Sequence, residues 1–495
     1  MKLTPKLTLV GLIAIILLGT GLRIYHLGTE DFWVDEIYTI QTAQIPLSTV
    51  TIAQLEPRDL LHFVYDFIIM HFWVKFGTNP WTVRLFSALV GIASIGLIYL
   101  IGKKLFDAKI GLLSALFLTL SSYHIYYSQE ACAYAVQVLF ILGMVYYFIS
   151  GFQDNKVSSW IMFTMVTVLG IAVREFTILT WVALTIYAIV SITILNRKPN
   201  RFGIWLGSQL LIVIACIIGL LLYYNRLGAM SYGDWLSQPT FFDLGKTFDY
   251  FSLGWVYWTL PNIIQTAIVP LFIFILLFSL VTLHQSESVN VAVDRNPGLM
   301  LCWSLFAIPL ILFYLISFKK PIFIAYRYLI IMLPFFYLLI AYAISKISQT
   351  IIRYIILAIL ISSMSVGTIA YHHVVKKIPW SKIAGVIDQK AQPNDLILIY
   401  EEFWKHGLQY YLKSSIPIRP VYVWQDLPTA LDSATKGYNR TWLITVTNSE
   451  PKPVDEVYRV LSGLYQEQRP LSTKSIRQPG EARVQVILYS SPINR

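Results

Sequence analysis

The sequence contains few charged residues for its length. Aspartate, glutamate, lysine and arginine make up 13% of its 495 residues, whereas soluble domains carry about 25%. Hydrophobic residues, in contrast, make up 56% of the chain. This deficit of charge excludes an ordinary soluble domain and predicts an integral membrane protein whose chain crosses the bilayer many times.

Cysteine is also scarce, and several common motifs are missing. The three cysteines, Cys132, Cys216 and Cys302, lie within or beside apolar runs, and no two have the spacing of a metal site. We expect them to pack as small apolar residues, with no disulfide framework and no zinc site. The sequence also has no glycine-rich phosphate loop, no internal repeat and no low-complexity tract.

Among the charges that are present, basic residues dominate, and the formal net charge is +11. In a soluble protein this excess would favour a nucleic-acid partner. In a membrane protein, basic residues near helix ends face the cytoplasm and anionic lipid. We therefore expect membrane lipids, and no nucleic acid, as partners.

The N-terminus has some features of a secretory signal peptide. Lys2 and Lys6 precede an apolar run over residues 7–22. Arg23-Ile24-Tyr25-His26 then follows, where a signal peptide has small residues for cleavage. This pattern favours a first helix that stays in the protein.

A membrane-spanning helix needs about 20 mostly apolar residues. The sequence predicts about eleven such spans. They lie near residues 7–26, 83–102, 108–124, 133–150, 157–174, 177–195, 203–224, 261–283, 299–317, 323–344 and 350–371.

The apolar segment 60–76 is not counted as a span, because it carries His62, Asp66, His71 and Lys75. A charge at the bilayer centre costs at least about 2.5 kcal/mol, so we expect an interfacial or re-entrant helix in the first external loop. The positive-inside rule then places the N-terminus in the cytoplasm and residues 372–495 on the other side. If segment 60–76 spanned the membrane, the lysine pair 103–104 would face outward, against that rule.

The composition changes after about residue 375. Segments 393–400, 416–424, 441–447 and 482–491 have the character of short strands, while 380–391 and 453–468 have helical spacing. Strands that alternate with helices indicate a small α/β domain. We therefore predict a membrane domain over residues 1–375 and an extracytoplasmic α/β domain over 376–495.

Residues 31–40, DFWVDEIYTI, place Asp35 and Glu36 side by side in the first external loop. The surrounding residues Phe32, Trp33, Ile37 and Tyr38 should hold this carboxylate pair against the membrane surface. A carboxylate there could act as a general base. The alternative is a solvated acidic loop with no chemical role.

Residues 121–135, SSYHIYYSQEACAYA, place Gln129 and Glu130 where the third predicted span ends. Polar residues at that depth tend to face a cavity, although a hydrogen-bonded helix turn is the alternative. Between two later spans, Arg174 and Glu175 are neighbours, and we expect them to neutralise each other as an ion pair.

Residues 318–330, FKKPIFIAYRYLI, carry Lys319, Lys320 and Arg327 at an external boundary, against the positive-inside trend. A lipid phosphate is a natural partner for a guanidinium fork. The alternative is that the lysines reach up to lipid headgroups. Arg84, at the start of the second span, could be an interfacial anchor in the same way.

Four segments in order resemble motifs of one family. They read WVDEIYT, HFVYDFIIMHFWVKFG followed by RLFSALVG, YSQEACAYAV and KPIFIAYRYLI. Together they resemble the GT-C membrane glycosyltransferases, specifically the bacterial protein-mannosyltransferase-like group of glycosyltransferase family 39, which is related to the lipid A aminoarabinose transferases. The resemblance covers roughly residues 5–375. Two departures stand out: Phe63-Val64 replaces a Pro-Pro pair, and Cys132 replaces an arginine.

The resemblance implies a multi-pass enzyme of the bacterial cytoplasmic membrane. Such an enzyme takes a sugar from a polyprenyl-phosphate donor on the outer face and passes it, with inversion, to the hydroxyl of a protein, lipid or glycan acceptor. Asp35 would be the base, and Glu36 would orient it or help to hold a divalent metal ion. The remaining candidates fall into two groups. Arg327, His62, Lys320 and Arg84 would bind the donor phosphate or lipid, and Glu130 and Gln129 would bind sugar hydroxyls, the acceptor or the metal.

Two other classes of protein stay open. A transporter or lipid flippase would also have many spans with charges inside the membrane, although transporters often show repeats. A binding protein, in which the C-terminal domain recruits partners and the membrane part is inactive, is the third possibility. Transfer of a sugar from a polyprenyl-phosphate donor would separate the enzyme from both.

Overall fold

The computed structural model describes residues 4–50, 63–195, 197–224, 238–284, 296–374, 377–422, 427–448, 452–476 and 482–492. The chain divides into two compact units. Unit 1 consists of Met1–Leu27, Thr42–Thr78 and Thr82–His372, and unit 2 of Gly28–Gln41, Asn79–Trp81 and His373–Arg495. Residues 28–41, which include Asp35 and Glu36, therefore share a compact unit with the C-terminal region.

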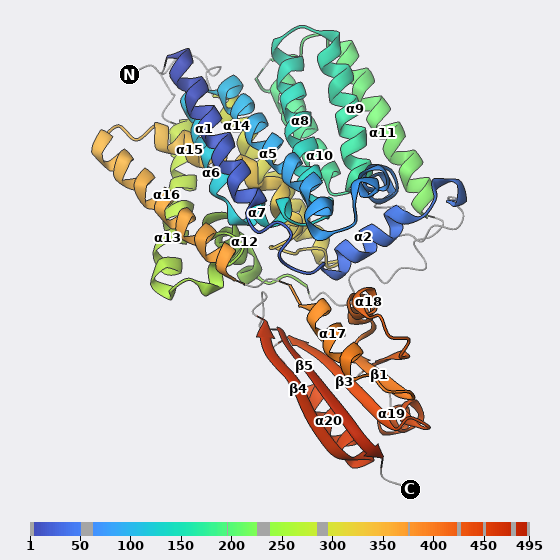
Figure 1. Ribbon diagram of the computed structural model, residues 1–495. Helices are drawn as coiled ribbons and strands as arrows, with labels where there is room; N and C mark the ends of the chain where they lie inside the picture. Colours follow the sequence, from blue (N-terminus) through green and yellow to red (C-terminus); the bar gives the residue numbers. More distant parts are fainter. Residues whose placement is uncertain are drawn as a thin grey trace. The chain divides into compact units, whose positions relative to one another are not determined.

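Unit 1 is helical (Figure 1). Within the described residues, 8 helices are long and apolar enough to cross a membrane, or 9 if the bent pair α6–α7 is one span. Two shorter apolar helices, α9 and α10, fill the fifth and sixth predicted spans. The helices in the predicted spans are α1 (Pro5–Ile24), α5 (Pro80–Leu105), α6 (Ala108–Leu120), α7 (Ser122–Ser128), α8 (Tyr134–Gln153), α9 (Val157–Val173), α10 (Thr177–Thr193), α11 (Phe202–Tyr224), α13 (Asn262–His284), α14 (Pro297–Ser317), η7 (Tyr328–Met332), α15 (Leu333–Ser345) and α16 (Thr350–His373).

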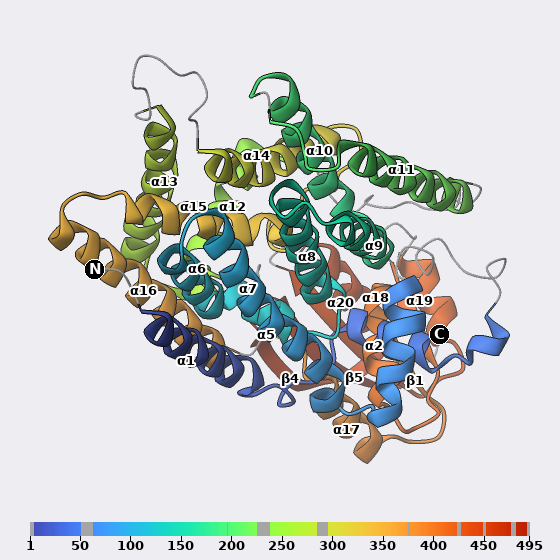
Figure 2. The same ribbon diagram turned by 90° about the horizontal axis from the view of Figure 1, so that it is seen from above.

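Each predicted span thus contains a helix, and the predicted all-α membrane class is confirmed. In both views α9 lies beside α8 and α11 (Figure 1, Figure 2).

The loop helix α12 (Phe241–Leu253) begins with a capping box, in which Thr240 and Asp243 bond reciprocally.

The apolar segment that we excluded from the spans is a short helix in the described residues. It consists of the π-helical turn η3 (Val64–Met70), α4 (His71–Trp73) and η4 (Val74–Phe76). Phe72 and Phe76 are exposed, and the Lys75 ammonium lies 4.7 Å from the Phe72 ring. An interfacial position suits exposed aromatic rings beside a cation.

Helices α5 and α6 approach each other closely at glycines. A Cβ on Gly102 would lie 2.7 Å from the Cα of Gly111, and a Cβ on Gly111 would lie 2.6 Å from the Tyr99 carbonyl oxygen. Small residues commonly mediate such backbone contacts between membrane helices. Gly96, on the same helix as Gly102, has open space instead.

Replacing Gly111 by alanine is therefore expected to destabilise the protein, because the added methyl must push the two backbones apart. Overpacking of this kind costs about 1–3 kcal/mol. Gly96→Ala is the matched control and should leave the stability unchanged or slightly raised, since alanine favours a helix by about 1 kcal/mol over glycine. Thermal unfolding in detergent measures both variants, and equal melting temperatures would contradict the close packing.

Unit 2 contains a 5-stranded sheet with strand order β2-β1-β3-β5-β4. Strand β1 is parallel to β2 and β3, whereas β5 is antiparallel to β3 and β4. The strands are β1 (Asp395–Tyr400), β2 (Ile418–Val421), β3 (Arg440–Asn448), β4 (Tyr465–Ile476) and β5 (Ala482–Pro492), and the helices are α17 (Trp380–Lys390), α18 (Glu402–Tyr411), α19 (Leu427–Thr435) and α20 (Lys452–Leu464).

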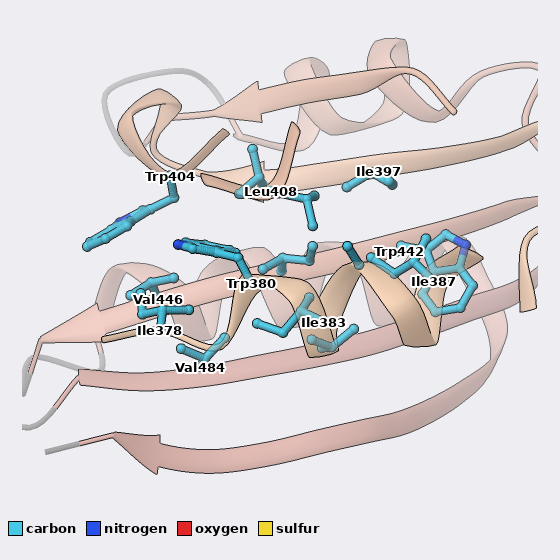
Figure 3. Packing of buried hydrophobic residues seen from close by; sticks show 14 of the residues in the cluster. Ile378, Trp380, Ile383, Ile387, Ile397, Trp404, Leu408, Trp442, Val446 and Val484 are labelled. Carbon is cyan, nitrogen blue, oxygen red and sulfur yellow. The ribbon is translucent and has the colours of Figure 1, made fainter. Parts of the chain in front are cut away.

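The helices cover the two faces of the sheet. On one face, Trp380 of α17 and Trp404 of α18 pack with sheet residues such as Val446 (Figure 3). On the other face, α19 and α20 pack against Leu398 and Leu443. The parallel strands alternate with helices, so the predicted α/β character of this region is confirmed.

One element of unit 2 was assigned wrongly from the sequence. The predicted helix 453–468 ends earlier, because α20 ends at Leu464 and strand β4 begins at Tyr465. Strand β4 pairs with β5 alone and lies at the edge of the sheet. Its sequence, YQEQRPLSTKSI, is mostly polar and lacks the apolar alternation that marks a strand.

Candidate functional site

Asp35 and Glu36 lie in the first turn of helix α2 (Val34–Gln44). Asp35 is half-buried, whereas Glu36 is fully buried. The Glu36 carboxylate accepts a hydrogen bond from the Trp33 backbone N–H (2.8 Å) and pairs with the Lys377 ammonium (2.6 Å). The first bond satisfies a donor at the start of the helix, and a carboxylate there also suits the helix dipole.

Helix α7 holds the segment that carries Arg327. The hydroxyl of Tyr123 donates to the carbonyl oxygens of Ala325 (3.1 Å) and Arg327 (3.4 Å), and the hydroxyl of Tyr127 donates to the carbonyl oxygen of Tyr326. The structure thus brings together two stretches singled out in the sequence, residues 121–135 and 318–330. The bonds involve backbone oxygens, so they fix the path of the chain and leave the Arg327 side chain out.

Arg327 immediately precedes η7 and is half-buried. Its guanidinium lies within electrostatic reach of the hydroxyls of Tyr123 and Tyr127. Lys319 and Lys320, at the other end of the same segment, are exposed. Residues 318–330 therefore place Arg327 beside an aromatic cluster and the two lysines at the surface.

Glu130 is buried and accepts a hydrogen bond from the Tyr126 hydroxyl (3.2 Å). The Tyr126 ring stacks on Trp255 with a centroid separation of 3.6 Å, and Trp255 also contacts the Tyr326 ring. Glu130 and Arg327 are therefore connected through one aromatic cluster. Carboxylates among aromatic rings are a common setting for sugar hydroxyls, because the rings offer apolar faces and the carboxylate accepts hydrogen bonds.

Gln129 is buried, and its side chain joins two helices. Its amide nitrogen donates to the carbonyl oxygens of Arg23 (2.9 Å) and Tyr25 (2.7 Å) at the end of α1, and its amide oxygen accepts from the Tyr371 hydroxyl of α16 (2.9 Å). A sugar could bind Gln129 only by displacing these bonds. Gln129 therefore fits the alternative given for it from the sequence, a hydrogen-bonded helix turn.

Of the two remaining candidates for the donor phosphate or lipid, the structure describes Arg84 but not His62. Arg84 is buried near the start of α5 and donates to the Leu27 carbonyl oxygen (3.2 Å), so part of its guanidinium is used inside the protein. His62 lies outside the described residues. Its assignment to the donor phosphate therefore stays a prediction.

Arg23 is a residue whose role the sequence did not indicate. It is fully buried and donates to the carbonyl oxygens of Gly19 (3.1 Å) and Leu118 (3.1 Å) and to Nδ1 of His124 (2.8 Å). Because a guanidinium cannot accept, Nδ1 of His124 must be the acceptor. Helices α6 and α7 meet at 66°, and Arg23 satisfies a carbonyl that the break leaves without a helical partner.

Within the described residues, Arg174 and Glu175 do not form the expected ion pair. Arg174 donates instead to the Tyr134 hydroxyl (2.7 Å), and its guanidinium lies 4.7 Å from the Tyr134 ring and 5.6 Å from the Tyr328 ring. Oε2 of Glu175 has no hydrogen-bond partner in the described part of the chain. Two aromatic faces compete for the guanidinium here, and adjacency in sequence does not reveal them.

Within the described residues, no group of three or more histidine, cysteine, aspartate or glutamate side chains could hold a metal ion. The divalent cation that the resemblance implies therefore has no identified ligand set, and it stays a prediction.

Known proteins similar to this chain share its architecture. The model of the dolichyl-phosphate-mannose-protein mannosyltransferase family matches residues 62–223. No curated protein matches the sequence. A crystal structure of ArnT from Cupriavidus metallidurans bound to undecaprenyl phosphate is similar over 96% of this chain and 97% of that chain, with a TM-score of 0.60 and 12% identity.

An archaeal enzyme has a similar fold. The oligosaccharyltransferase AglB from Archaeoglobus fulgidus, in complex with an inhibitory peptide and a dolichol-phosphate, matches over 89% of this chain and 69% of that chain, with a TM-score of 0.56 and 9% identity. A structure of the Archaeoglobus enzyme with Zn and sulfate matches with a TM-score of 0.54 and 10% identity, over 88% of this chain and 68% of that chain. The chain therefore has the same fold as ArnT and AglB, and this is the fold that the resemblance of the sequence motifs predicted.

Proposed function

We propose that the protein transfers a sugar from a polyprenyl-phosphate-linked donor to the hydroxyl of an acceptor, on the extracytoplasmic face of a bacterial cytoplasmic membrane. The observation that carries this proposal is the likeness to ArnT, which extends over 96% of this chain and 97% of that chain. ArnT is seen with undecaprenyl phosphate and AglB with a dolichol-phosphate. A polyprenyl phosphate is therefore the lipid carrier that we infer for this chain.

The proposed reaction is a single displacement with inversion at the anomeric carbon. The acceptor oxygen forms a bond to that carbon while the bond from the carbon to the donor phosphate breaks, and the phosphate leaves with the electron pair. Asp35 accepts the proton of the acceptor hydroxyl as the new bond forms. General-base assistance of this kind contributes about 10²–10⁴-fold to the rate.

The remaining residues have supporting roles in this proposal. Arg327, with His62 and Lys320, stabilises the negative charge that develops on the departing phosphate, since fixed cations act most strongly where charge appears in the transition state. Glu130 binds hydroxyls of the sugar. Glu36 does not touch the substrate in this scheme, because its carboxylate is fully buried and pairs with Lys377.

The test uses purified protein in lipid vesicles with undecaprenyl-phosphate glucose or undecaprenyl-phosphate mannose, each labelled in the sugar. An extract of the source cells' envelope supplies the acceptor. We expect the label to leave the lipid and to appear on an acceptor. A flippase would move the labelled lipid between leaflets and leave the sugar attached to it, and that outcome would reject the proposed transfer.

A further inference from the structure

The loop that carries Asp35 is packed into the core of unit 2. The loop is fixed at two points: Oδ2 of the Asp31 side chain accepts from the backbone N–H of Ser381 (2.7 Å), and the backbone N–H of Phe32 donates to the Tyr411 hydroxyl (2.9 Å). Ser381 lies in the first turn of α17. A carboxylate there satisfies an N–H that the helix cannot satisfy itself.

Aromatic contacts reinforce these bonds. The Trp33 ring lies 5.5 Å from the Trp404 ring, and the Tyr38 ring lies 5.9 Å from the His406 ring, both on α18. Val34 is buried in the same hydrophobic cluster as Trp380. Residues on both sides of Asp35 are therefore held by helices α17 and α18.

The residue that follows Asp35, Glu36, forms a buried ion pair with Lys377. The side chains are 0% and 4% exposed, and the two charged atoms are 2.6 Å apart. Lys377 lies 341 residues further along the chain, just before α17. A buried carboxylate requires a partner. The position of Lys377 therefore restricts the position of Glu36 and of the first turn of α2.

We infer that the C-terminal domain is a positioning module for the Asp35 carboxylate, and that Lys377 is its main positioning residue. This inference rests on the proposed function. Glu36 follows Asp35 directly in the chain. Loss of the Lys377 ammonium from the Glu36 carboxylate would therefore move the backbone from which the Asp35 side chain projects. A displacement of about 1 Å at a reacting group can cost about 10²-fold in rate.

The test compares Lys377→Met with Lys377→Arg in the full-length protein. We expect Lys377→Met to lower kcat for sugar transfer by about tenfold to a hundredfold, while the KM for the lipid donor changes by less than about twofold. Lys377→Arg keeps a cation beside Glu36 and should recover most of the activity. Lys382→Met is the matched control: Lys382 is an exposed lysine on α17, and its removal should leave both constants unchanged.

Two further variants keep the test decisive if Lys377→Met folds poorly. The double variant Glu36→Gln/Lys377→Met removes both charges. Because the two residues act as a pair, its kcat should be close to that of Lys377→Met alone, and the losses caused by the two substitutions should not multiply. Tyr411→Phe removes only the hydroxyl that accepts from Phe32, and a smaller loss of kcat at unchanged KM is expected.

The outcomes separate this inference from the proposed function. If the wild-type protein transfers sugar and the Lys377 and Tyr411 variants keep its kcat, the inference fails while the function stands. If the loss of kcat disappears once each rate is divided by the amount of folded protein, the domain has only a structural role, and the inference also fails. If the wild-type protein transfers no sugar, the proposed function itself is wrong.

Discussion

Asp35→Asn is expected to abolish most sugar transfer, with kcat lower by about 10²–10⁴-fold. The amide keeps the size of the side chain but cannot accept the proton of the acceptor hydroxyl at neutral pH. Binding of the lipid donor does not need this proton transfer, so the KM for the donor should stay within about threefold of the wild-type value. The measurement is the initial rate of transfer from a labelled undecaprenyl-phosphate sugar in vesicles, at several donor concentrations.

The control for this prediction is Asp432→Asn. Asp432 is an exposed carboxylate of α19 in the same compact unit, so its loss changes the net charge equally and should leave kcat unchanged. The fold should survive Asp35→Asn, because the buried pair that holds this turn is formed by Glu36 and Lys377. Near-normal turnover of Asp35→Asn would remove Asp35 as the base.

The membrane helices could be predicted from the sequence because their signal is local. A run of about 20 apolar residues is sufficient for a span, and each predicted run contains a helix in the structure. Strand β4 could not be predicted in this way, since its stability comes from pairing with β5 and not from its own polar sequence. Tertiary context overrides local preference at such an edge strand.

The candidate site was predictable only in part. The sequence indicated that residues 121–135 and 318–330 matter, but not that tyrosine hydroxyls of α7 bind backbone carbonyls before Arg327. Carbonyl oxygens are present at every residue, so no sequence pattern marks the ones that are used. The same limit applies to Lys377, whose partner Glu36 lies 341 residues away.

Arg327→Ala is the second substitution with a large expected effect. A hydrogen bond from a charged group is worth about 1.5–3 kcal/mol, which corresponds to a loss of about 10–10²-fold in kcat/KM for the lipid donor. Use of the acceptor should suffer much less, because the guanidinium is assigned to the donor phosphate. The measurement is kcat/KM for each substrate in turn, with the other held at saturation.

The structure allows this effect to be separated from misfolding. Tyr123 and Tyr127 bind the carbonyl oxygens of residues 325–327 and not the Arg327 side chain, so the segment should keep its path when the guanidinium is removed. Lys319→Ala is the matched control, since Lys319 is an exposed cation of the same segment and should change kcat/KM by less than about twofold. Arg327→Lys restores the charge without the bidentate geometry and should recover only part of the loss. If Arg327→Ala instead impaired the acceptor more than the donor, the cation would belong to the acceptor side of the reaction, and its assignment to the phosphate would be wrong.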